Sequence, residues 1–499
     1  MMIRLVVASA GIFLIAGISD CCKKPSVADT ASPVATAFNG QGAAQEASDV
    51  PDDSGQSTAK ADSGAAVAAT SPVAEWNVLI YMNAKNNLES VSVQNLHAIA
   101  TAGSTKDVNV IVLYGKYSWE PHHVYQLRIT KGMPDPDPTK PPAESTNVKD
   151  EGDLDMGALE TLREFLRRVH EQFPAKNTLL DIWDHGQGWR LEDMSLLAAL
   201  PKGRQSKIRA MRAARKGTPM SNYRSVSYDE WTGHHLFNSD VESSLNDFPV
   251  DIVGFDACLM GMIETGYAVR RGGRILVASE ELVPNAGWNY EVVLGELTSH
   301  PEMTPAAVAH AVGESYSQLY MGDGAKLQDE TTTMAVVDLT KVNSVANAIS
   351  IFAIQLTRAI ATNDGLAVIG AARGDCREYA PSYLAPDGKP EFQDVDVDLF
   401  AKGIVDRSSD DALVGAARAV RGTVAKYVVD KWVGADRHGR YGSAGLAIYF
   451  PNSGAVYARD RKSPEVGNGY EKNNADHPVD FVRNEKWSDF LHSYFTRVP

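Results

Sequence analysis

The stretch TLLDIWDHGQGW, residues Thr178–Trp189, passes from an apolar run directly into a histidine flanked by glycine. A second stretch, DIVGFDACLMGM at 251–262, passes in the same way into a cysteine. Runs that are apolar throughout, without alternation, are typical of strands buried on both faces of a parallel sheet. Because the carboxyl ends of such strands form the ligand crevice, we expect His185 and Cys258 to lie close together.

Similar short runs recur through the chain and alternate with helical patterns. The other expected strands are Trp76–Met82, Val108–Tyr114, Val124–Thr130, Arg274–Ser279, Thr333–Asp338 and Ala444–Phe450. The segment Leu154–Phe173 has an apolar face at helical spacing and charge on the other face, and the Pro-rich segment Met133–Pro142 is typical of a loop. This alternation predicts an α/β sandwich with a mainly parallel central sheet.

Composition narrows the class of protein. The chain has 499 residues, with 48 basic and 63 acidic side chains and a net charge of −15. Nucleic-acid binding usually needs a basic surface, so we expect no nucleic-acid partner.

The first residues are typical of an export signal. Arg4 is followed by Leu5–Ile18, a small and apolar run that is shorter than the ~20 residues needed to span a bilayer. Cys21-Cys22 comes next, as at a bacterial lipoprotein cleavage site, so we expect lipidation at Cys21 and an anchor at the cell envelope; without the lipid the protein would be periplasmic or secreted. The acidic Asp20 is unusual beside such a cysteine.

Differences in composition along the chain also indicate where its domains and linkers lie. Residues 21–75 are poor in large apolar side chains and cannot bury enough surface to offset the entropy of ordering, which predicts a disordered tether. We therefore expect an export signal at 1–20, a tether at 21–75, a folded core at 76–300 with a basic linker near 195–225, and a region at 301–499 that completes or packs on the core.

Cys258 and His185 together can perform nucleophilic catalysis, with a thiolate nucleophile and a proton donor for the leaving amine. The pattern Leu259–Arg271 predicts a helix directly after Cys258, whose N-terminus would lower the pKa of the thiol. Asp256 would raise it if it faced the thiol, so we expect Asp256 to point toward a cationic substrate side chain. The only other cysteine beyond Cys21-Cys22 is Cys376, in a polar, loop-like context. A Cys258–Cys376 disulfide, giving a redox-gated protein, is the alternative.

A basic segment interrupts the acidic chain. No acidic residue lies between Pro201 and Gly217, whereas seven basic residues do: Lys202, Arg204, Lys207, Arg209, Arg212, Arg215 and Lys216. A solvated loop, a nucleic-acid or lipid patch, and a linker cut by the protein itself all fit this pattern.

The chain resembles the clostripain family of cysteine peptidases, which are relatives of caspases, gingipains and legumains. The matching stretches are WNVLIYMNAKNNLE (76–89), DIWDHGQGW (181–189), DIVGFDACLMGMIETGYAVR (251–270), ASEELVPNAGW (278–288), FQDVDVDLF (392–400) and GLAIYFP (445–451). The resemblance implies a three-layer caspase-like sandwich with a C-terminal α/β extension, and an endopeptidase acting on proteins or peptides. A catalytically silent binding module on the same fold is the other function considered.

Residue by residue, the resemblance implies that Cys258 and His185 are the catalytic pair and that Gly186 is the oxyanion donor beside the Cys258 N–H. It implies that Asp256 forms the acidic floor of the pocket for the residue before the scissile bond, and hence cleavage after Arg or Lys. Relatives often carry an acidic residue in the turn before Trp288, where this chain has Asn285-Ala286-Gly287, which predicts a weaker or mixed basic preference.

Relatives are cut between the histidine and cysteine motifs into two chains that stay together. The basic segment lies there, so we expect self-cleavage in 202–216 and a monomer or a two-chain form. We expect no required cofactor. Some relatives need calcium, but no compact Asp/Asn/Gly loop identifies a site; Asp394, Asp396 and Asp398 alternate along an expected strand, where a solvated edge and a metal site are equally compatible.

Overall fold

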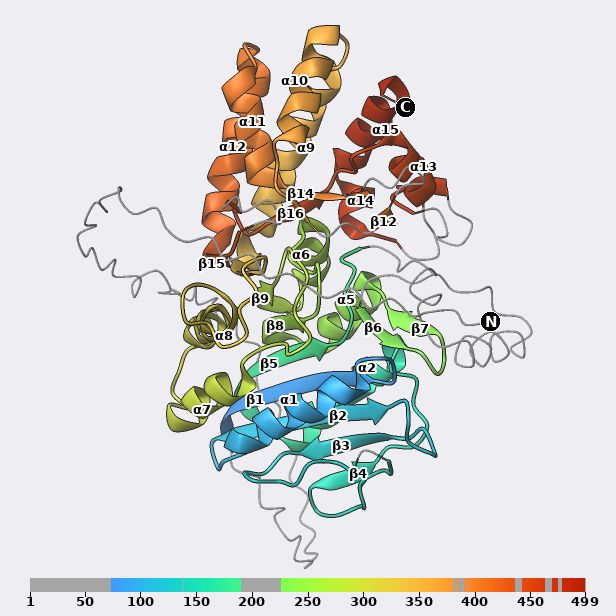
Figure 1. Ribbon diagram of the computed structural model, residues 1–499, viewed down its shortest axis with the longest axis vertical. Coiled ribbons are helices and arrows are strands. Elements are labelled where there is room, and N and C mark those ends of the chain that lie inside the picture. Colours follow the sequence, from blue (N-terminus) through green and yellow to red (C-terminus); the bar gives the residue numbers. More distant parts are fainter. Residues whose placement is uncertain are drawn as a thin grey trace, which may run out of the picture. The chain divides into compact units, whose positions relative to one another are not determined.

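The computed structural model describes residues 73–137, 139–189, 226–379, 383–384, 390–391, 393–435, 442–462, 469–473 and 478–498 (Figure 1). All of them belong to one unit, residues 69–499. The expected export signal, Cys21, nearly all of the expected tether and the seven basic residues of 202–216 lie outside the described residues. No helix in the described part of the chain is long and apolar enough to cross a membrane.

A nine-stranded sheet lies at the centre of the fold, in the order β15-β10-β9-β8-β5-β1-β2-β3-β4. Its strands are β1 (Ala74–Ala84), β2 (Val108–Lys116), β3 (Val124–Arg128), β4 (Val148–Asp150), β5 (Ala175–Trp183), β8 (Val250–Asp256), β9 (Gly273–Ala278), β10 (Thr333–Asp338) and β15 (Val428–Val433). The five inner strands from β9 to β2 pair in parallel, and the flanking strands pair antiparallel. The predicted mainly parallel sheet is therefore confirmed.

The strands are apolar throughout because both faces of the sheet are covered. In β1, Val78 and Ile80 belong to one hydrophobic core, whereas Leu79 and Tyr81 belong to the other. Successive side chains of a strand point to opposite faces, so an apolar run with no alternation supplies two cores at once. The result is the predicted three-layer sandwich.

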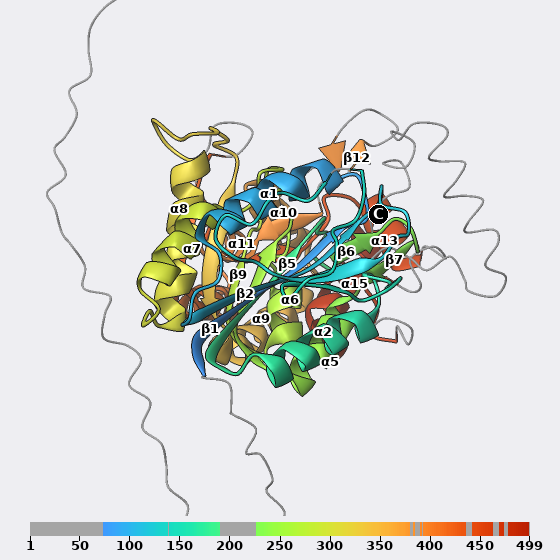
Figure 2. The same ribbon diagram turned by 90° about the horizontal axis from the view of Figure 1, so that it is seen from below.

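The first of these cores is completed by α1 (Glu89–Ala102), α7 (Tyr290–Ser299) and α8 (Pro305–Tyr320). The second is completed by α2 (Leu159–Gln172), α5 (Asn238–Asp247), α6 (Ile263–Val269) and helices from the C-terminal half. Figure 2 shows α1 and α2 on opposite sides of the central strands. The predicted helix in Leu154–Phe173 is α2.

The C-terminal half extends the fold. Its strands β10 and β15 join the central sheet, and a second sheet is formed by β11 (Glu378–Tyr379), β14 (Asp394–Asp396) and β16 (Ala447–Tyr449). One short hairpin of this half pairs β12 (Tyr383–Leu384) with β13 (Pro390–Glu391). Another, which precedes β8 in the chain, pairs β6 (Val226–Asp229) with β7 (His234–Leu236). The helices are α9 (Val342–Ala359), α10 (Asn363–Gly374), α11 (Val397–Arg407), α12 (Asp411–Tyr427), α13 (Gly454–Lys462), α14 (Asp480–Asn484) and α15 (Trp487–Arg497), coloured yellow-orange to red in Figure 1.

The prediction for three aspartates is wrong. The three aspartates near 396 do not share one strand: Asp394 and Asp396 are buried in β14, whereas Asp398 lies in the first turn of α11 and pairs with Arg421. The strand ends because the Asp396 carboxylate accepts the backbone N–H of Leu399 at 2.8 Å and caps the helix.

The alternative of a disulfide is also wrong, because Cys258 and Cys376 are both free thiols. Cys376 is 1% exposed just after α10, and its thiol donates to the carbonyl of Ala372. Burial raises the pKa of this thiol, so Cys376 is an inert core residue.

Candidate active site

The histidine and cysteine motifs end two neighbouring parallel strands. Strands β5 and β8 pair in a register that places Trp183 opposite Asp256, two residues before His185 and Cys258 respectively. The contact continues beyond the strands, because a Cβ built on Gly186 would lie 2.2 Å from the carbonyl oxygen of Cys258 and 2.9 Å from its nitrogen. Only glycine permits so close an approach, and the segment His185-Gly186 therefore lies directly against the backbone of Cys258.

The surroundings of the Cys258 thiol differ from the expectation. Leu259 has a φ of 62° and turns the chain, and α6 begins only at Ile263, so the predicted helix directly after Cys258 is wrong. The half-buried thiol instead receives the backbone N–H of Val283, with a distance of 3.2 Å from nitrogen to Sγ. A hydrogen bond to the charged form favours it, so this N–H can stabilise a thiolate where the helix N-terminus does not reach.

The loop that supplies this N–H follows β9. Its residues Ser279 and Glu281 accept the backbone N–H groups of Gly261 and Leu259 at 2.7 and 3.2 Å. Two backbone hydrogen bonds just after Cys258 therefore hold the turn that carries the thiol to the loop that carries Val283.

His185 is half-buried, and its Nε2 lies 2.8 Å from the side-chain oxygen of Asn87. An amide oxygen only accepts hydrogen bonds, so Nε2 carries the proton and Nδ1 is the basic nitrogen. Burial lowers the pKa of His185 to about 4, so the imidazole is neutral at pH 7.

Sequence reasoning missed the role of Asn87. Asn87 follows β1, the strand beside β5, and its neighbour Asn86 donates to the Asp184 carboxylate at 2.7 Å. The signal was present in the sequence: YMNAKNNLE places two consecutive amides just after an apolar strand, at the edge of the sheet where His185 lies.

Asp256 lies at the end of β8, 4% exposed. Its Oδ2 accepts the backbone N–H of Trp288 and the hydroxyl of Tyr290, each at 2.9 Å. Gly287, with a φ of 66°, presses against the carboxylate, where a Cβ would lie 2.3 Å from Oδ2. Burial raises the pKa of Asp256 to about 6, against the lowering effect of these hydrogen bonds. The group is thus held beside the turn 285–287, two residues before the thiol.

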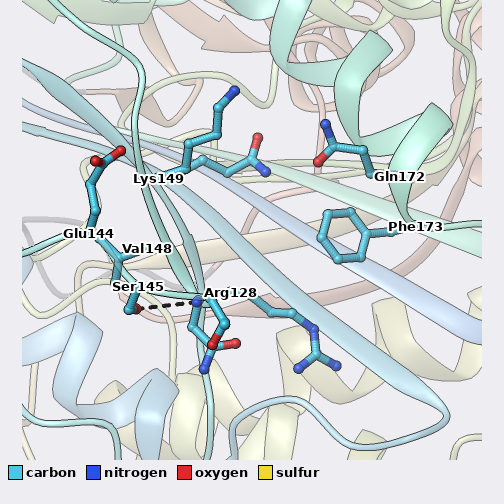
Figure 3. A pocket seen from close by; sticks show the side chains of 10 residues that line it. Arg128, Glu144, Ser145, Val148, Lys149, Gln172 and Phe173 are labelled. Carbon is cyan, nitrogen blue, oxygen red and sulfur yellow. Dashed lines mark hydrogen bonds between the residues drawn. The ribbon is translucent and has the colours of Figure 1, made fainter.

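Other parts of the described chain offer little as sites. No group of three or more His, Cys, Asp or Glu among the described residues could hold a metal ion. A hollow of about 530 Å³ lies between β3, β4 and the end of α2, lined by Arg128, Glu144 and Phe173 among others (Figure 3). Phe173 precedes β5 whereas His185 follows it, so this hollow lies at the opposite edge of the sheet.

Solved proteases of known structure are similar to this chain in fold. A secreted C11 cysteine protease from Bacteroides thetaiotaomicron, solved in complex with an irreversible peptide inhibitor, is 14% identical with a TM-score of 0.50, and the match covers 84% of this chain and 99% of that one. An inactive zymogen C11 protease from Parabacteroides distasonis is 17% identical with a TM-score of 0.49, over 86% and 97% of the two chains. No curated protein sequence is significantly similar to this chain.

The fold is that of the caspase-like α/β peptidases, with a cysteine and a histidine at adjacent strand ends. The model of the clostripain family, Peptidase_C11, matches residues 80–200 and 212–494. The chain belongs to the clostripain family and is a cysteine peptidase, as the motifs predicted.

Proposed function

We propose that this peptidase hydrolyses internal peptide bonds with Cys258 as nucleophile and His185 as its acid/base partner. The observation that supports this most is the adjacency of the two strand ends, which lays His185-Gly186 against Cys258. The neutral imidazole of His185 takes the thiol proton at Nδ1 as Sγ attacks the substrate carbonyl. The same proton then passes to the leaving amine as the C–N bond breaks, and water hydrolyses the thioester.

Two backbone N–H groups are proposed to bind the oxyanion of the tetrahedral intermediate, those of Gly186 and Cys258. Both come from the strand-end turns that approach each other, and preorganised donors of this kind are worth about 2.7–4 kcal/mol each to catalysis. The Val283 N–H favours the thiolate and so lowers the cost of forming the nucleophile.

Asp256 is proposed to bind the residue before the scissile bond, with preference for Arg or Lys. The buried carboxylate offers a basic side chain a strong partner because the site is poorly solvated. The turn Asn285-Ala286-Gly287 adds no acidic side chain, so the preference rests on this group.

A peptide-library assay tests these roles. The wild type should cleave after Arg and Lys, Cys258→Ala should abolish cleavage, and His185→Ala should lower kcat by at least about a hundredfold. Alkylation of Cys258 under non-reducing conditions should inactivate the enzyme. A wild type that cleaves no peptide and binds some without turnover would instead support the binding-module alternative.

Self-processing is proposed for the basic segment between the two motifs. It holds seven basic residues without an acidic one, and the family match is interrupted there at 201–211. Purified protein should acquire new N-termini within 202–216, and the two pieces should stay together. Equally fast cutting of Cys258→Ala protein would contradict self-processing.

Export and lipid anchoring at the cell envelope are proposed from the N-terminal pattern around Cys21. The related protease from B. thetaiotaomicron is described as secreted. Labelling with a palmitate analogue should modify the wild type and not a Cys21→Ala variant; labelling that survives this change and is lost in Cys22→Ala would place the lipid on the neighbouring residue. No cofactor is proposed, and activity in the presence of a calcium chelator tests this directly.

A further inference from the structure

One tyrosine hydroxyl lies between two buried carboxyl groups beneath the proposed specificity pocket. Tyr290 Oη is 2.6 Å from Asp181 Oδ2 and 2.9 Å from Asp256 Oδ2. The three residues come from α7, β5 and β8, and all are buried. A tyrosine hydroxyl carries a single proton, so it cannot donate to both oxygens. One of the two carboxyl groups must therefore be protonated.

The backbone contacts indicate which one it is. Asp256 Oδ2 already accepts the N–H of Trp288 at 2.9 Å, as an ionised oxygen does well. Asp181 uses only Oδ1 toward the backbone, accepting the Asp256 N–H at 3.0 Å. With the proton on Asp181 Oδ2, Asp181 donates to Tyr290 and Tyr290 donates to Asp256, so every contact has a donor and an acceptor.

We propose that Asp181, held protonated, and Tyr290 form a relay that places one negative charge on Asp256, and that both are positioning residues for basic specificity. This inference rests on the proposed function, because it assigns Asp256 to the substrate side chain. In this relay Asp256 Oδ2 accepts hydrogen bonds from Trp288 and Tyr290 and is fully used within the protein. Among the described residues nothing donates a hydrogen bond to its Oδ1, which leaves that oxygen for the substrate cation.

The electrostatic surroundings of the two carboxyl groups also favour a protonated Asp181 and an ionised Asp256. Burial raises the pKa of both carboxyl groups, and the neighbouring Asp256 raises the pKa of Asp181 further, so Asp256 is the first to ionise. Among the described residues, Tyr316 and Tyr320 of α8 are further titratable groups whose pKa values the Asp256 charge raises. Within the described ranges no Lys or Arg forms an ion pair with either carboxyl group, so a substrate guanidinium would be the counterion.

The test compares two matched peptides, with Arg or its neutral analogue citrulline before the scissile bond, at pH 7. The ratio of their kcat/KM values should fall about a hundredfold in Asp256→Asn, which loses the charge. Asp181→Asn, which mimics the protonated acid, should keep the ratio within about threefold, whereas Asp181→Leu and Tyr290→Phe should lower it about tenfold. The exposed Asp323→Asn serves as a control for loss of one acidic group. A ratio that collapses in Asp181→Asn as far as in Asp256→Asn would overturn the relay, as would unchanged ratios in Asp181→Leu and Tyr290→Phe.

Infrared spectroscopy locates the proton without any peptide. The wild type minus Asp181→Asn difference spectrum at pH 7 should contain the carbonyl band of a protonated carboxyl group, and the wild type minus Asp256→Asn spectrum should lack it. The reverse pattern, or no band in either, would refute the proposal. If the wild type fails to prefer Arg over citrulline, the proposed specificity is wrong, while this spectrum still decides the state of Asp181.

Discussion

At the scale of single residues, the proposed acid/base group depends on one amide. The side-chain oxygen of Asn87 lies 2.8 Å from Nε2 of His185 and accepts its N–H, which keeps Nδ1 unprotonated. Removing the amide in Asn87→Ala should lower kcat by about ten- to a hundredfold with little change in KM, because the imidazole is left without its orienting partner. Steady-state kinetics on one good substrate measure this, and a purely KM effect would argue against it.

The acid side of the pH profile offers a sharper test of the same contact. Burial holds the pKa of His185 at about 4, so the basic form persists down to that pH. The Asn87→Asp variant places a carboxylate where the amide was. A carboxylate favours the imidazolium form of His185 and should raise the pKa of His185. The acid limb of kcat/KM should therefore move to higher pH. An unmoved limb would mean that this pair does not set it.

Gly186 gives a prediction on packing. A Cβ at this position would lie 2.2 Å from the Cys258 carbonyl oxygen, so Gly186→Ala must push the two strand-end turns apart. We expect it to lower the free energy of unfolding by about 1–3 kcal/mol and to abolish peptidase activity. Gly295→Ala is the matched control: among the described residues, apart from the neighbouring backbone of α7 itself, no atom lies within 4 Å of the added Cβ, so the change should be neutral or stabilising. Urea unfolding and activity assays compare them.

At the scale of elements, the loop after β9 connects the thiol to the C-terminal half. Glu280 accepts the hydroxyl of Tyr379 at 2.9 Å and also bonds to Ser443. Three residues further along, the same loop donates the Val283 N–H to the thiol. The C-terminal half thus holds a loop that contacts the nucleophile.

Loosening that connection should lower the reactivity of the thiol. Tyr379→Phe removes a buried hydrogen bond and should cost about 0.5–1.5 kcal/mol of unfolding free energy. It should also slow alkylation of Cys258 several-fold, because the Val283 N–H becomes less well placed. Tyr125→Phe, the same change on β3 beside Asp150, should leave alkylation unaffected. Equal rates in wild type and Tyr379→Phe would disprove the connection.

The strands of the central sheet could largely be predicted from the apolar pattern of the sequence. The apolar runs predicted β1, β2, β5, β8, β9 and β10 because a strand covered on both faces has a local signature. The helix after Cys258 began four residues later than expected, at Ile263, because Leu259 turns the chain and bonds to Glu281 of a distant loop. That bond has no local signature.

At the scale of the whole molecule, buried acids set the response of stability to pH. Burial raises the pKa of Glu264 and Glu242 to about 7 and that of Glu280 to about 8. In the unfolded chain such groups lose their protons near pH 4. Between about pH 4 and 8 the folded state therefore binds more protons, so its stability falls as pH rises. The lowered pKa of His185 has the opposite effect and makes stability rise with pH. It acts only below about pH 6.5, where the histidine of the unfolded chain binds a proton.

We expect the unfolding free energy to be larger at pH 6 than at pH 9. Glu264→Gln should flatten part of this slope, since an amide cannot ionise. Urea unfolding at several pH values measures both, and a stability that rises from pH 6 to pH 9 would contradict the assignment of these acids as protonated.

Much about this protein was determined by its sequence alone. Apolar strands predicted an α/β sandwich with a mainly parallel sheet, and two strand-end motifs pointed to Cys258 and His185, because strand burial and backbone turns depend on neighbouring residues. The family resemblance of the same motifs added the three-layer architecture and the proposed roles of Gly186 and Asp256. Only the tertiary structure placed Asn87, Val283 and Tyr290 around those residues and brought Asp181 against Asp256. These partners come from separate elements, and their contacts exist only after the sheet and its covering helices have packed.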